Sequence, residues 1–412
     1  MNIKLRNDAE QIARTAIAEM SPDSAVKRAL KNKKFSGRIF LISVGKAGWQ
    51  MAKSAVECME QEIYKGLVVT KYNHVLEEIP NVTCYEAGHP VPDENSFLGT
   101  QAVLEATADL NEDDTVLFLL SGGGSALFEA PLVSGEELQN ITKQLLHSGA
   151  DIKEMNTIRK RLSKVKGGRF AQWCAPAKVE AIILSDILGD PLDMIASGPT
   201  VADASTCQQA MEIAEKYNLS ISEKAKELLQ QETPKEILNV HTSVIGSVRE
   251  LCEAAARECK RMGYEAIILT DCLECEAKDA GIFLADILKA HKDEKGIAYI
   301  AGGETVVHVS GDGLGGRNQE FALAAAATLS GMDNLALISV GSDGTDGPTD
   351  AAGGYVDGDT YSSLQKAGYD YDAIMTNHDA YHGLKAVDGL IITGPTGTNV
   401  NDVAIGLISK EE

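Results

Sequence analysis

One stretch of the sequence combines glycines, a guanidinium group and two carboxylates in an order that suits phosphate chemistry. Within residues 299–347, the expected strand TVVHVS leads into the turn GDGLGG (311–316), and Arg317 then opens an expected helix. A second expected strand, LALISV, ends in a loop that contains Asp343 and Asp346. Glycine N–H groups and the positive end of a helix can surround an anion. The stretch therefore predicts phosphoryl transfer, with a metal ion held by carboxylates.

The residues of this stretch receive separate predicted roles. We expect Arg317 to be catalytic, Asp343 to be a metal ligand, and three neighbours to bind phosphate: Gly311, Gly313 and Asn318. The pattern GxGxxG at 311–316 also matches a dinucleotide fingerprint. That alternative requires an acidic residue roughly twenty positions farther along, and Asp343 lies beyond this spacing. Asp343 and Asp346 each precede a glycine, so an ordinary turn is the structural alternative for both.

Lys46 is a second candidate for catalysis at a phosphate. It follows the expected strand RIFLISV (38–44) and precedes an expected helix, so its amine can reach an anion bound by helix N–H groups. The full phosphate-loop pattern GxxxxGK[ST] is not met, because Phe40 and Ala47 stand where glycine and serine or threonine would be needed. A surface lysine at a tight turn is the alternative.

Three consecutive glycines between two serines follow the expected strand at 114–120. A flexible turn is the simple explanation, but three glycines add an entropic cost to folding that such a turn would avoid. We therefore expect a backbone nest for an anion at the start of a helix. Its members are Ser121, Gly122, Gly123, Gly124 and Ser125.

Six lysines and arginines are concentrated in NTIRKRLSKVKGGR (156–169) of an otherwise acidic chain. The apolar residues of this segment share one helical face, so most of the cations are expected on a solvated face. We expect one or two of these cations to line an anionic substrate site. Asn156 and Arg159 are our candidates for binding substrate or phosphate.

Asp186 is the third catalytic candidate. It lies at the carboxyl end of the expected strand VEAIILS, where a carboxylate could orient a substrate hydroxyl group or hold a metal ion. The nearby Asp190 and Asp193 are instead expected to cap a helix, because Asp190 precedes proline and Asp193 follows three positions later. Asp186 is therefore assigned both as a catalytic residue and, with Asp343, as a metal ligand.

Composition and charge narrow the class of protein. A chain of 412 residues exceeds one typical domain, and 44% hydrophobic with 24% charged residues is ordinary for a globular enzyme. A net charge of −22 argues against a nucleic-acid partner, whose phosphates require a basic face. The eight cysteines form no disulfide framework, the N-terminus lacks the apolar core of a signal peptide, and no apolar run reaches membrane-spanning length. We expect a soluble, cytoplasmic protein without a membrane partner.

Apolar strands alternate with helical segments along the chain, which predicts an α/β fold with a parallel sheet covered on both faces. The polar segment QQETPK (230–235) interrupts this series and predicts a domain boundary, giving domains at residues 1–235 and 236–412. The expected strand TSVIGS (242–247) then opens the second series. Ligands of open α/β sheets bind at the carboxyl ends of the strands, which is where the candidate loops lie.

Taken together, the motifs resemble the glycerate 2-kinases that carry a leucine-rich C-terminal module, the MOFRL family. The similarity extends over almost the whole chain, in one order. Its segments are VGKA (44–47), GHPVPD (88–93), SGGGSALFEAP (121–131), MNTIRKRLSKVKGGR (155–169), LSDILGDPLDMIASGPT (184–200), GGETVVHVSGDGLGGRNQEFALAAA (302–326), SVGSDGTDGPTDAAGG (339–354) and TGPTGTNVND (393–402).

The resemblance implies a fold, a reaction and cofactors. The expected fold has a larger Rossmann-like α/β/α domain and a second α/β domain of the MOFRL type, with the active site in the cleft between them. The implied reaction transfers the γ-phosphate of ATP to the 2-hydroxyl group of D-glycerate, with Mg²⁺ as the metal. The resemblance also implies catalytic or phosphate-binding roles for Lys46 and Arg317.

Two alternatives from other functional classes stay open at this point. One is an NAD(P)H-dependent hydroxypyruvate reductase, which rests on the GxGxxG pattern and on the older description of some relatives. The other is a non-catalytic nucleotide- or anion-binding protein. In either case we expect a monomer or a homodimer.

Overall fold

The computed structural model describes residues 2–59, 61–185, 189 and 191–410, which fold into two compact units. The N-terminal unit contains residues 25–185 and 191–245. The C-terminal unit contains residues 2–24 and 246–410, so it is assembled from both ends of the chain. Helix α2 (Pro22–Leu30) includes the division between the two units near its start.

The N-terminal unit is built on a six-stranded sheet in which all neighbouring strands are parallel, in the order β3-β2-β1-β4-β5-β6. The central strands β1 and β4 are buried along their whole length. Their alternate side chains enter hydrophobic clusters on opposite faces of the sheet, with Phe40 and Phe118 in one cluster and Leu41 and Leu117 in the other. The strands are β1 (Ile39–Val44), β2 (Lys65–Lys71), β3 (Val82–Ala87), β4 (Thr115–Leu120), β5 (Lys178–Leu184) and β6 (Val240–Ile245).

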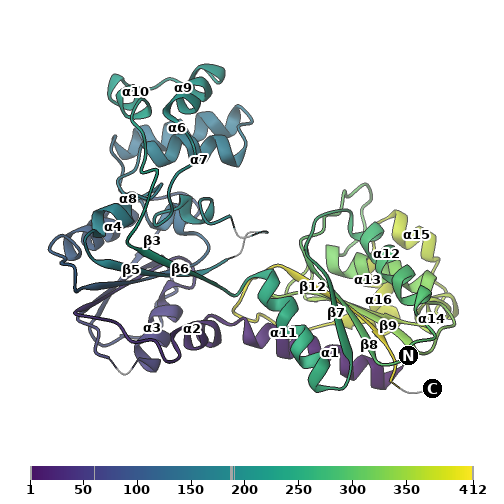
Figure 1. Cartoon of the computed structure of the whole chain (residues 1–412). Coiled ribbons are helices and arrows are strands. Elements are labelled where there is room, and N and C mark those ends of the chain that lie inside the picture. The colour runs from purple at the N-terminus through teal and green to yellow at the C-terminus, as the bar shows by residue number, and fades with distance from the viewer. Residues whose placement is uncertain (1, 60, 186–188, 190, 411–412) are drawn as a thin grey trace. The chain divides into compact units, whose positions relative to one another are not determined.

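Helices of the N-terminal unit cover this sheet and also form a helical group of their own. In Figure 1, α6, α7, α9 and α10 pack together beyond the sheet, around a cluster that includes Ile141, Ile158 and Ile213. The described helices after α2 are α3 (Gly48–Cys58), α4 (Glu94–Ala106), α5 (Gly124–Leu127), α6 (Gly135–His147), α7 (Ile152–Arg161), α8 (Arg169–Cys174), the 3₁₀ turn η1 (Ile195–Ser197), α9 (Cys207–Lys216) and α10 (Glu223–Leu229).

The C-terminal unit has a second six-stranded sheet, in the order β11-β10-β9-β12-β8-β7. Only the pair β7–β8 is parallel, and β12 lies antiparallel between β8 and β9. The strands are β7 (Glu265–Leu273), β8 (Ile297–Gly303), β9 (Leu335–Gly341), β10 (Gly353–Asp357), β11 (Leu390–Ile391) and β12 (Asp402–Ile408). This sheet is therefore mixed, whereas the first is parallel throughout.

Helices cover both faces of the second sheet as well. On one face, α1 packs against α11, and Leu5, Ile12 and Leu251 share a core with the sheet residue Ile338. On the other face, α12 and α13 pack together over a core that includes Phe321. The helices are α1 (Ile3–Glu19), α11 (Val248–Arg261), α12 (Ala277–Ala290), α13 (Arg317–Leu329), α14 (Thr360–Lys366), α15 (Tyr371–Thr376) and α16 (Ala380–Ala386).

The structure confirms the α/β class and corrects the predicted domain limits of 1–235 and 236–412. The first helix belongs to the C-terminal unit, because its apolar face packs on α11. The segment TSVIGS was expected to open the second domain, but most of it lies in β6. This strand completes the first sheet by pairing with β5, with Val240 opposite Val179. The division therefore follows Ile245 and not residue 235.

The expected strand TVVHVS is also wrong. Only Val306 makes a β-bridge, to Glu276, and the rest of the segment is irregular. The neighbouring β7 is an edge strand with two register shifts against β8, so no regular ladder extends to this segment. The glycine-rich turn that follows is consequently a loop between β8 and α13.

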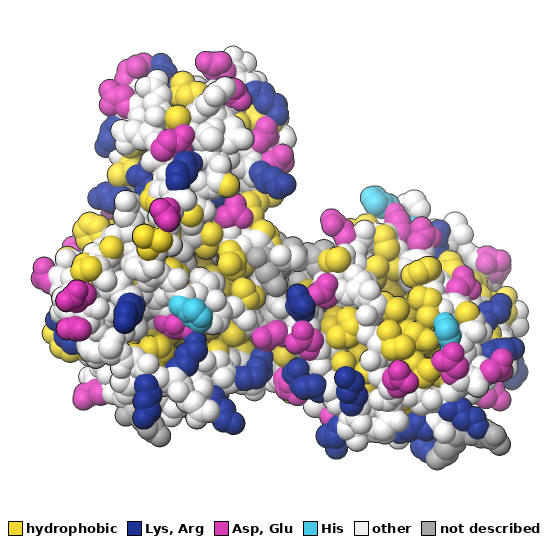
Figure 2. Space-filling model, in the orientation of Figure 1, with side chains coloured by type: hydrophobic (Ala, Val, Ile, Leu, Met, Phe, Trp, Pro, Cys, Tyr) yellow, Lys and Arg dark blue, Asp and Glu magenta, His cyan; other side chains and the backbone are white. Residues whose placement is uncertain are grey.

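The surface carries charges of both signs. On the face shown in Figure 2, acidic and basic side chains are interspersed over both units. Among the described residues, every helix is too short or too polar to cross a membrane.

Candidate functional site

The loops that follow β1 and β4 lie side by side at the carboxyl edge of the first sheet. The N–H group of Lys46 donates to the carbonyl oxygen of Gly122 at 2.8 Å, and that of Ala47 donates to Ser121 Oγ at 3.1 Å. Ser121 N–H donates back to the carbonyl oxygen of Val44 at 2.9 Å. These bonds hold two candidate segments together, the lysine loop and the triple-glycine turn.

Two glycines allow this close approach. Gly45 has a φ of +121°, and a Cβ atom there would overlap the Ser121 hydroxyl and carbonyl oxygens. Gly123 has a φ of +86°, and its Cβ atom would lie 3.1 Å from Lys46 Cγ and 3.0 Å from His89 Cδ2. The Lys46 stem and the His89 ring therefore both border the glycine turn. Positive φ values favour glycine at both positions.

The side chain of Lys46 is exposed, and its ammonium group has no hydrogen-bond or ion-pair partner among residues 2–59, 61–185, 189 and 191–410. The neighbouring backbone is fixed instead, because the Lys46 carbonyl oxygen contacts His74 Nδ1 at 2.9 Å. An unpaired ammonium group on an anchored backbone can bind an incoming phosphate without first breaking an ion pair.

The triple-glycine turn continues into the short helix α5, and buried cations hold its carbonyl groups. Lys166 Nζ donates to the carbonyl oxygens of Ser125 and Phe128, both at 2.9 Å. Arg159 Nη2 donates to the same Ser125 carbonyl at 3.0 Å. Two cations on one carbonyl oxygen direct positive potential towards the glycine turn. Arg159 is thus placed at the predicted site, acting through the backbone.

The electrostatics of this group are unusual because its charges are buried. Lys166 and Glu129 are both fully buried, 3.5 Å apart, and neither Glu129 oxygen accepts a hydrogen bond from the part of the chain that the structure describes. Burial lowers the pKa of Lys166 to about 8, with the carboxylate of Glu129 opposing the shift and the charge of Arg159 adding to it. Burial also lowers the pKa of Arg159. Such desolvated charges are costly and are enriched at functional sites.

A strained turn faces the glycine segment. Ala196, Ser197 and Gly198 have φ values of 51°, 60° and 64°, three successive residues in the left-handed region. Ser197 Oγ donates to Asn156 Oδ1 at 2.8 Å and lies 3.5 Å from Ser125 Oγ. Left-handed alanine and serine cost roughly 1–3 kcal/mol each and cluster at functional sites. Asn156 is therefore also placed at this site, where it orients Ser197.

The basic segment 156–169 differs from the solvated face that its sequence predicted. Lys160, Arg161 and Lys166 are buried. Lys160 contacts Asp193 and Asp203, both at 3.2 Å, and Arg161 forms ion pairs with Asp203 and Glu232. The cations are buried because carboxylates far along the chain neutralise them. Asp193 therefore serves as an ion-pair partner of Lys160 and not as the predicted helix cap. Asp186 and Asp190 lie outside the described residues.

In the C-terminal unit, Arg317 is the first residue of α13 and is held by carboxylates. Its Nε and Nη2 atoms donate to the two oxygens of Asp402 at 2.5 and 3.0 Å, and Nη1 donates to Glu304 Oε1 at 3.0 Å. Burial alone would lower the pKa of Arg317, but the hydrogen bonds and charge of Asp402 raise it above its ordinary value. The guanidinium stays charged, and about a third of the side chain is exposed.

The glycine-rich turn at 311–316 does not form the predicted phosphate nest. The N–H groups of Asp312 and Gly313 donate to Asn377, and that of Leu314 donates to Asp379 Oδ1. Cβ atoms at Gly311 and Gly313 would overlap Asn377. The glycines thus permit packing against the loop at 377–379, and three consecutive amide groups of the turn, those of residues 312–314, are already used.

The start of α13 is likewise occupied by a carboxylate of the chain itself. Asp346 accepts hydrogen bonds from the N–H groups of Asn318 and Gln319 at 3.1 and 2.8 Å, and from Gln319 Nε2 at 3.0 Å. The Asn318 side chain also accepts a bond from Ser339 Oγ at 2.7 Å. Because Asp346 fills the anion position at the helix start, it is a capping residue, and Asn318 supports that cap.

Asp343 has the geometry of a turn residue with a partly exposed carboxylate. Its Oδ1 accepts from the N–H group of Thr345 at 2.9 Å, and its carbonyl oxygen accepts from Thr396. The described residues include no cluster of three or more histidine, cysteine, aspartate or glutamate side chains that could hold a metal. A single carboxylate still fits Mg²⁺, which commonly uses one or two protein carboxylates together with substrate phosphates and water.

Several residues of these constellations carried no distinctive sequence pattern. His89, Ser197, Asp402 and Glu304 were not predicted, because each reaches its site from another loop or strand and not from the segment that holds the predicted residue. The local indication was that all four lie inside segments of the family resemblance: His89 in GHPVPD, Ser197 in LSDILGDPLDMIASGPT, Glu304 in GGETVVHVSGDGLGGRNQEFALAAA and Asp402 in TGPTGTNVND.

Comparison with known proteins gives family matches in both parts of the chain. The domain of unknown function DUF4147 matches residues 8–230, and the MOFRL family matches residues 297–402. The sequence is 53% identical over 411 residues to the D-glycerate 2-kinase of Thermotoga maritima, covering 98% of each chain. It is 42% identical to the glycerate 2-kinase of Pyrococcus horikoshii, covering 96% of each. A protein of Agrobacterium vitis named putative hydroxypyruvate reductase is 37% identical, over 99% of this chain and 95% of that one.

Solved structures agree with these sequence matches. The crystal structure of glycerate kinase from Thermotoga maritima has a TM-score of 0.93 at 53% identity, covering 98% of this chain and 99% of that chain. A structure from Pyrococcus horikoshii has a TM-score of 0.95 at 40% identity, covering 100% and 99%. Since the sequence, the domain pair and the fold all match over nearly the full length, the chain belongs to the MOFRL-domain family of glycerate 2-kinases.

Proposed function

We propose that this protein is a D-glycerate 2-kinase, which transfers the γ-phosphate of ATP to the 2-hydroxyl group of D-glycerate and releases 2-phosphoglycerate and ADP. The observation that carries the proposal is the 53% identity to the D-glycerate 2-kinase of Thermotoga maritima across 98% of both chains. The exposed ammonium group of Lys46 beside the triple-glycine turn supports it, because phosphoryl transfer depends mainly on positioning and charge neutralisation.

In this reaction a bond forms between the γ-phosphorus and the glycerate 2-oxygen, and the bond to the β–γ bridging oxygen breaks. We assign Lys46 and Arg317 to the negative oxygens of the phosphate groups. The proton of the attacking hydroxyl passes to a carboxylate, for which Asp186 is our proposal. Lys46 supplies a movable point charge, whereas the planar fork of Arg317 is held in one orientation by Asp402.

The triple-glycine turn is our proposed site for the glycerate carboxylate. Its amide groups can surround an anion, and the cations of Arg159 and Lys166 reinforce the positive potential from behind. We assign Asn156 and Arg159 to positioning this turn and the neighbouring Ser197. Gly311 and Gly313 are left out of the proposal, since the adjoining amides bond to residues 377–379.

Mg²⁺ is the proposed metal, with Asp343 as a ligand alongside nucleotide phosphates and water. Its chemistry would be to neutralise charge on the phosphate oxygens. Asp346 is not proposed as a ligand, because its oxygens accept hydrogen bonds from the start of α13.

The test is product identification. Incubation with D-glycerate, ATP and Mg²⁺ should yield 2-phosphoglycerate, which phosphorus NMR separates from the 3-isomer. Appearance of the 3-isomer alone would overturn the acceptor position but retain the kinase class. Oxidation of NAD(P)H with hydroxypyruvate and without ATP would favour the reductase instead. ATP-dependent thermal stabilisation without any product would favour a binding protein.

The reductase alternative loses its structural support. Its basis was GxGxxG between a strand and a helix, but TVVHVS is not a strand and the glycine turn packs on the loop at 377–379. The anion position at the start of α13, where a dinucleotide would place its pyrophosphate, is filled by Asp346.

A further inference from the structure

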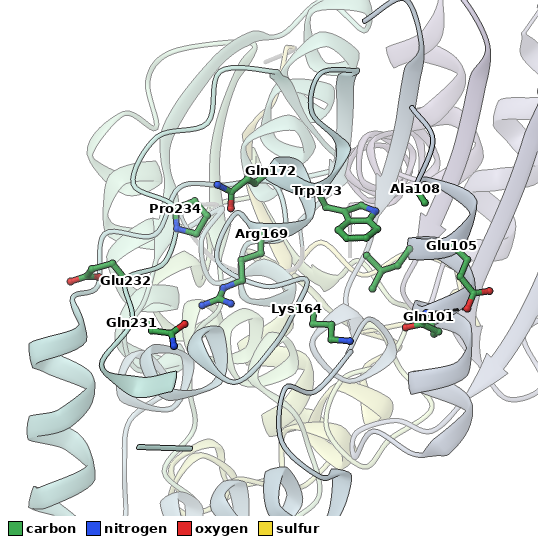
Figure 3. Close-up of a pocket in the computed structure, with 11 residues that line it drawn as sticks. Gln101, Glu105, Ala108, Lys164, Arg169, Gln172, Trp173, Gln231, Glu232 and Pro234 are labelled. Atoms are coloured by element: carbon green, nitrogen blue, oxygen red, sulfur yellow. Dashed lines mark hydrogen bonds between the residues drawn. The ribbon is translucent and has the colours of Figure 1, made fainter. Parts of the chain in front are cut away.

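A pocket of about 780 Å³ lies on the N-terminal unit apart from the loops described above. Figure 3 shows that it is bordered by α4, by the start and end of α8, and by residues 231–234. Its lining includes none of the proposed catalytic residues, neither Lys46 nor any member of the triple-glycine turn. The volume is in the range of roughly 300–1,000 Å³ that small-molecule sites occupy.

Two cations face this pocket without a counter-ion. Arg169 is half-buried, and its Nε atom is buried without a hydrogen-bond partner. Across the described parts of the chain, neither Arg169 nor Lys164 has a side-chain hydrogen bond or an ion pair. Burial lowers the pKa of Arg169, with the charge of Arg161 adding to the shift and that of Asp203 opposing it. Unpaired cations are notable in a chain with a net charge of −22.

The two carboxylates on the pocket have hydrogen-bond partners other than Arg169 and Lys164. Glu232 accepts from Arg161 at 3.2 Å, from Lys235 at 2.9 Å and from the N–H group of Cys207 at 2.9 Å. The Cys207 and Lys235 hydrogen bonds lower its pKa to about 2. Glu105 accepts from Gln101 at 3.0 Å. Neither carboxylate forms an ion pair with Arg169 or Lys164, so both cations are available to an anionic ligand.

Trp173 supplies a flat apolar surface beside these cations. Its side chain is 48% exposed, and its Nε1 atom donates to Thr107 Oγ1 at 3.1 Å, which fixes the ring orientation. In Figure 3 the indole ring, the Arg169 side chain and Lys164 surround the same space, with Gln172 and Gln231 nearby. Indole rings stack on planar ligands, and guanidinium groups bind carboxylate or phosphate through two parallel hydrogen bonds.

We propose that this pocket is a second ligand site, which binds a small organic anion that joins a flat ring to a phosphate or carboxylate group. The anionic group lies on Arg169 and Lys164, and the ring lies on Trp173. The amide groups of Gln172 and Gln231 are suited to the polar edge of the ring. The site is independent of the proposed kinase activity.

The experiment uses Trp173 as its own reporter. The chain has two tryptophans, and Trp49 is buried with its Nε1 bound to the carbonyl oxygen of Glu77. In a Trp49→Phe background, Trp173 fluorescence is titrated with AMP and with benzoate, which represent the two sources of a ring-bearing anion. Adenosine and ribose 5-phosphate serve as probes that lack the anion or the ring.

The expected result is saturable quenching by AMP or benzoate. Arg169→Gln and Lys164→Gln should each weaken it at least tenfold. Lys143→Gln, an exposed lysine away from the pocket, should leave the titration unchanged. In the unaltered Trp49 chain, Trp173→Phe should abolish the response. Lys46→Met should not alter it, which separates this site from nucleotide binding for catalysis. No saturable response to AMP or benzoate at millimolar concentration would overturn the proposal. Equal responses in the Arg169→Gln variant and the parent protein would also overturn it. So would a response to ribose 5-phosphate or adenosine as strong as the response to AMP.

Discussion

Arg317 and Asp402 form a two-point ion pair, with Nε–Oδ2 and Nη2–Oδ1 distances of 2.5 and 3.0 Å. Arg317 opens α13 and Asp402 opens β12, so the pair joins a helix start to a strand start at one end of the second sheet. The third guanidinium nitrogen reaches Glu304, which also accepts from Asn401 Nδ2 at 2.9 Å. The direction of the guanidinium is therefore set by residues outside its own helix.

From this ion pair we predict that the difference in stability between the wild-type protein and Asp402→Asn depends on pH. Burial raises the pKa of Asp402 to about 6, the hydrogen bonds and charge of Arg317 oppose the rise, and Asp346 adds to it. In the unfolded chain the pKa of an aspartate is about 3.9, so the folded state binds this proton more tightly. The stability that Asp402 contributes is therefore complete below about pH 4 and is lost as the pH rises through 6. The free energy of unfolding falls by about 3 kcal/mol over this pH range. Urea unfolding should show Asp402→Asn gaining stability relative to wild type by up to about this amount between pH 4 and 7.

The comparison between the two proteins isolates the titration of Asp402 and its coupling to Asp346 and Arg317, because groups outside this cluster titrate alike in both. Asp402→Asn weakens the hold on Arg317 at every pH, so its stability at a single pH carries no information on the titration. A difference in unfolding free energy that stays constant from pH 4 to 7 would contradict the raised pKa.

Removal of the Arg317 guanidinium should abolish most of the proposed activity. A guanidinium that acts on the charge of the transferring phosphoryl group contributes roughly three to five orders of magnitude in rate. Arg317→Ala should therefore lose this much turnover in a coupled ADP assay, and Arg317→Lys should recover only part, because an ammonium group cannot reproduce the two-point geometry. Arg249→Ala is the matched control, since Arg249 is an exposed arginine of the same unit. Near-normal turnover of Arg317→Ala would rule out the assigned role.

Gly45 and Gly149 offer a matched pair for testing the lysine loop. Both have positive φ, but a Cβ atom at Gly45 would overlap Ser121, whereas Gly149 has no neighbouring atom within 4 Å. Gly149→Ala should show only the backbone cost, roughly 1–3 kcal/mol, with normal kinetics. Gly45→Ala must displace the segment that positions Lys46, so we expect a larger fall in melting temperature and a loss of turnover. Equal effects in both variants would show that the contact with Ser121 is unimportant.

The parts of the fold that the sequence predicted are those with local causes. Strands β1 and β4 are apolar runs that end in glycine-containing turns, so their ends and the candidate loops were recognisable. The pairing of Val179 with Val240 and the packing of α1 on α11 join distant segments, and no local pattern reports them. The domain limits were misplaced for this reason.

The same distinction explains the outcome at the candidate site. Lys46 and the triple-glycine turn were each recognisable as candidates, because each follows a central strand of the parallel sheet. The role of Asp346 was missed, since it depends on the approach of Gly316 to a loop farther along the chain. The basic segment was expected to be solvated, because its spacing shows the cations but not the carboxylates of Asp203 and Glu129 that lie opposite.

Asp343 and Asp346 should respond differently to amide substitution, although both precede glycine in the same loop. Asp346 caps α13, so Asp346→Asn should lower the unfolding free energy by roughly 0.5–2 kcal/mol at any Mg²⁺ concentration. Asp343→Asn should retain stability and instead require more Mg²⁺ for half-maximal activity. Unfolding curves and Mg²⁺ titrations of both variants measure the two effects. An exchange of the two phenotypes would reverse the assignments of metal ligand and cap.

The buried pair of Lys166 and Glu129 predicts a non-additive double-mutant cycle. Lys166→Met leaves the buried Glu129 carboxylate without its ion-pair partner and frees the Ser125 and Phe128 carbonyl groups, so we expect a loss of roughly 3–5 kcal/mol in unfolding free energy. Glu129→Leu leaves the ammonium group without its carboxylate but keeps both carbonyl bonds, so its loss should be smaller. The double variant should be more stable than the sum of the two losses implies, because an apolar pair removes both buried charges. Additive losses would show that the charges do not interact, and that Lys166 stabilises the turn through the carbonyl bonds alone.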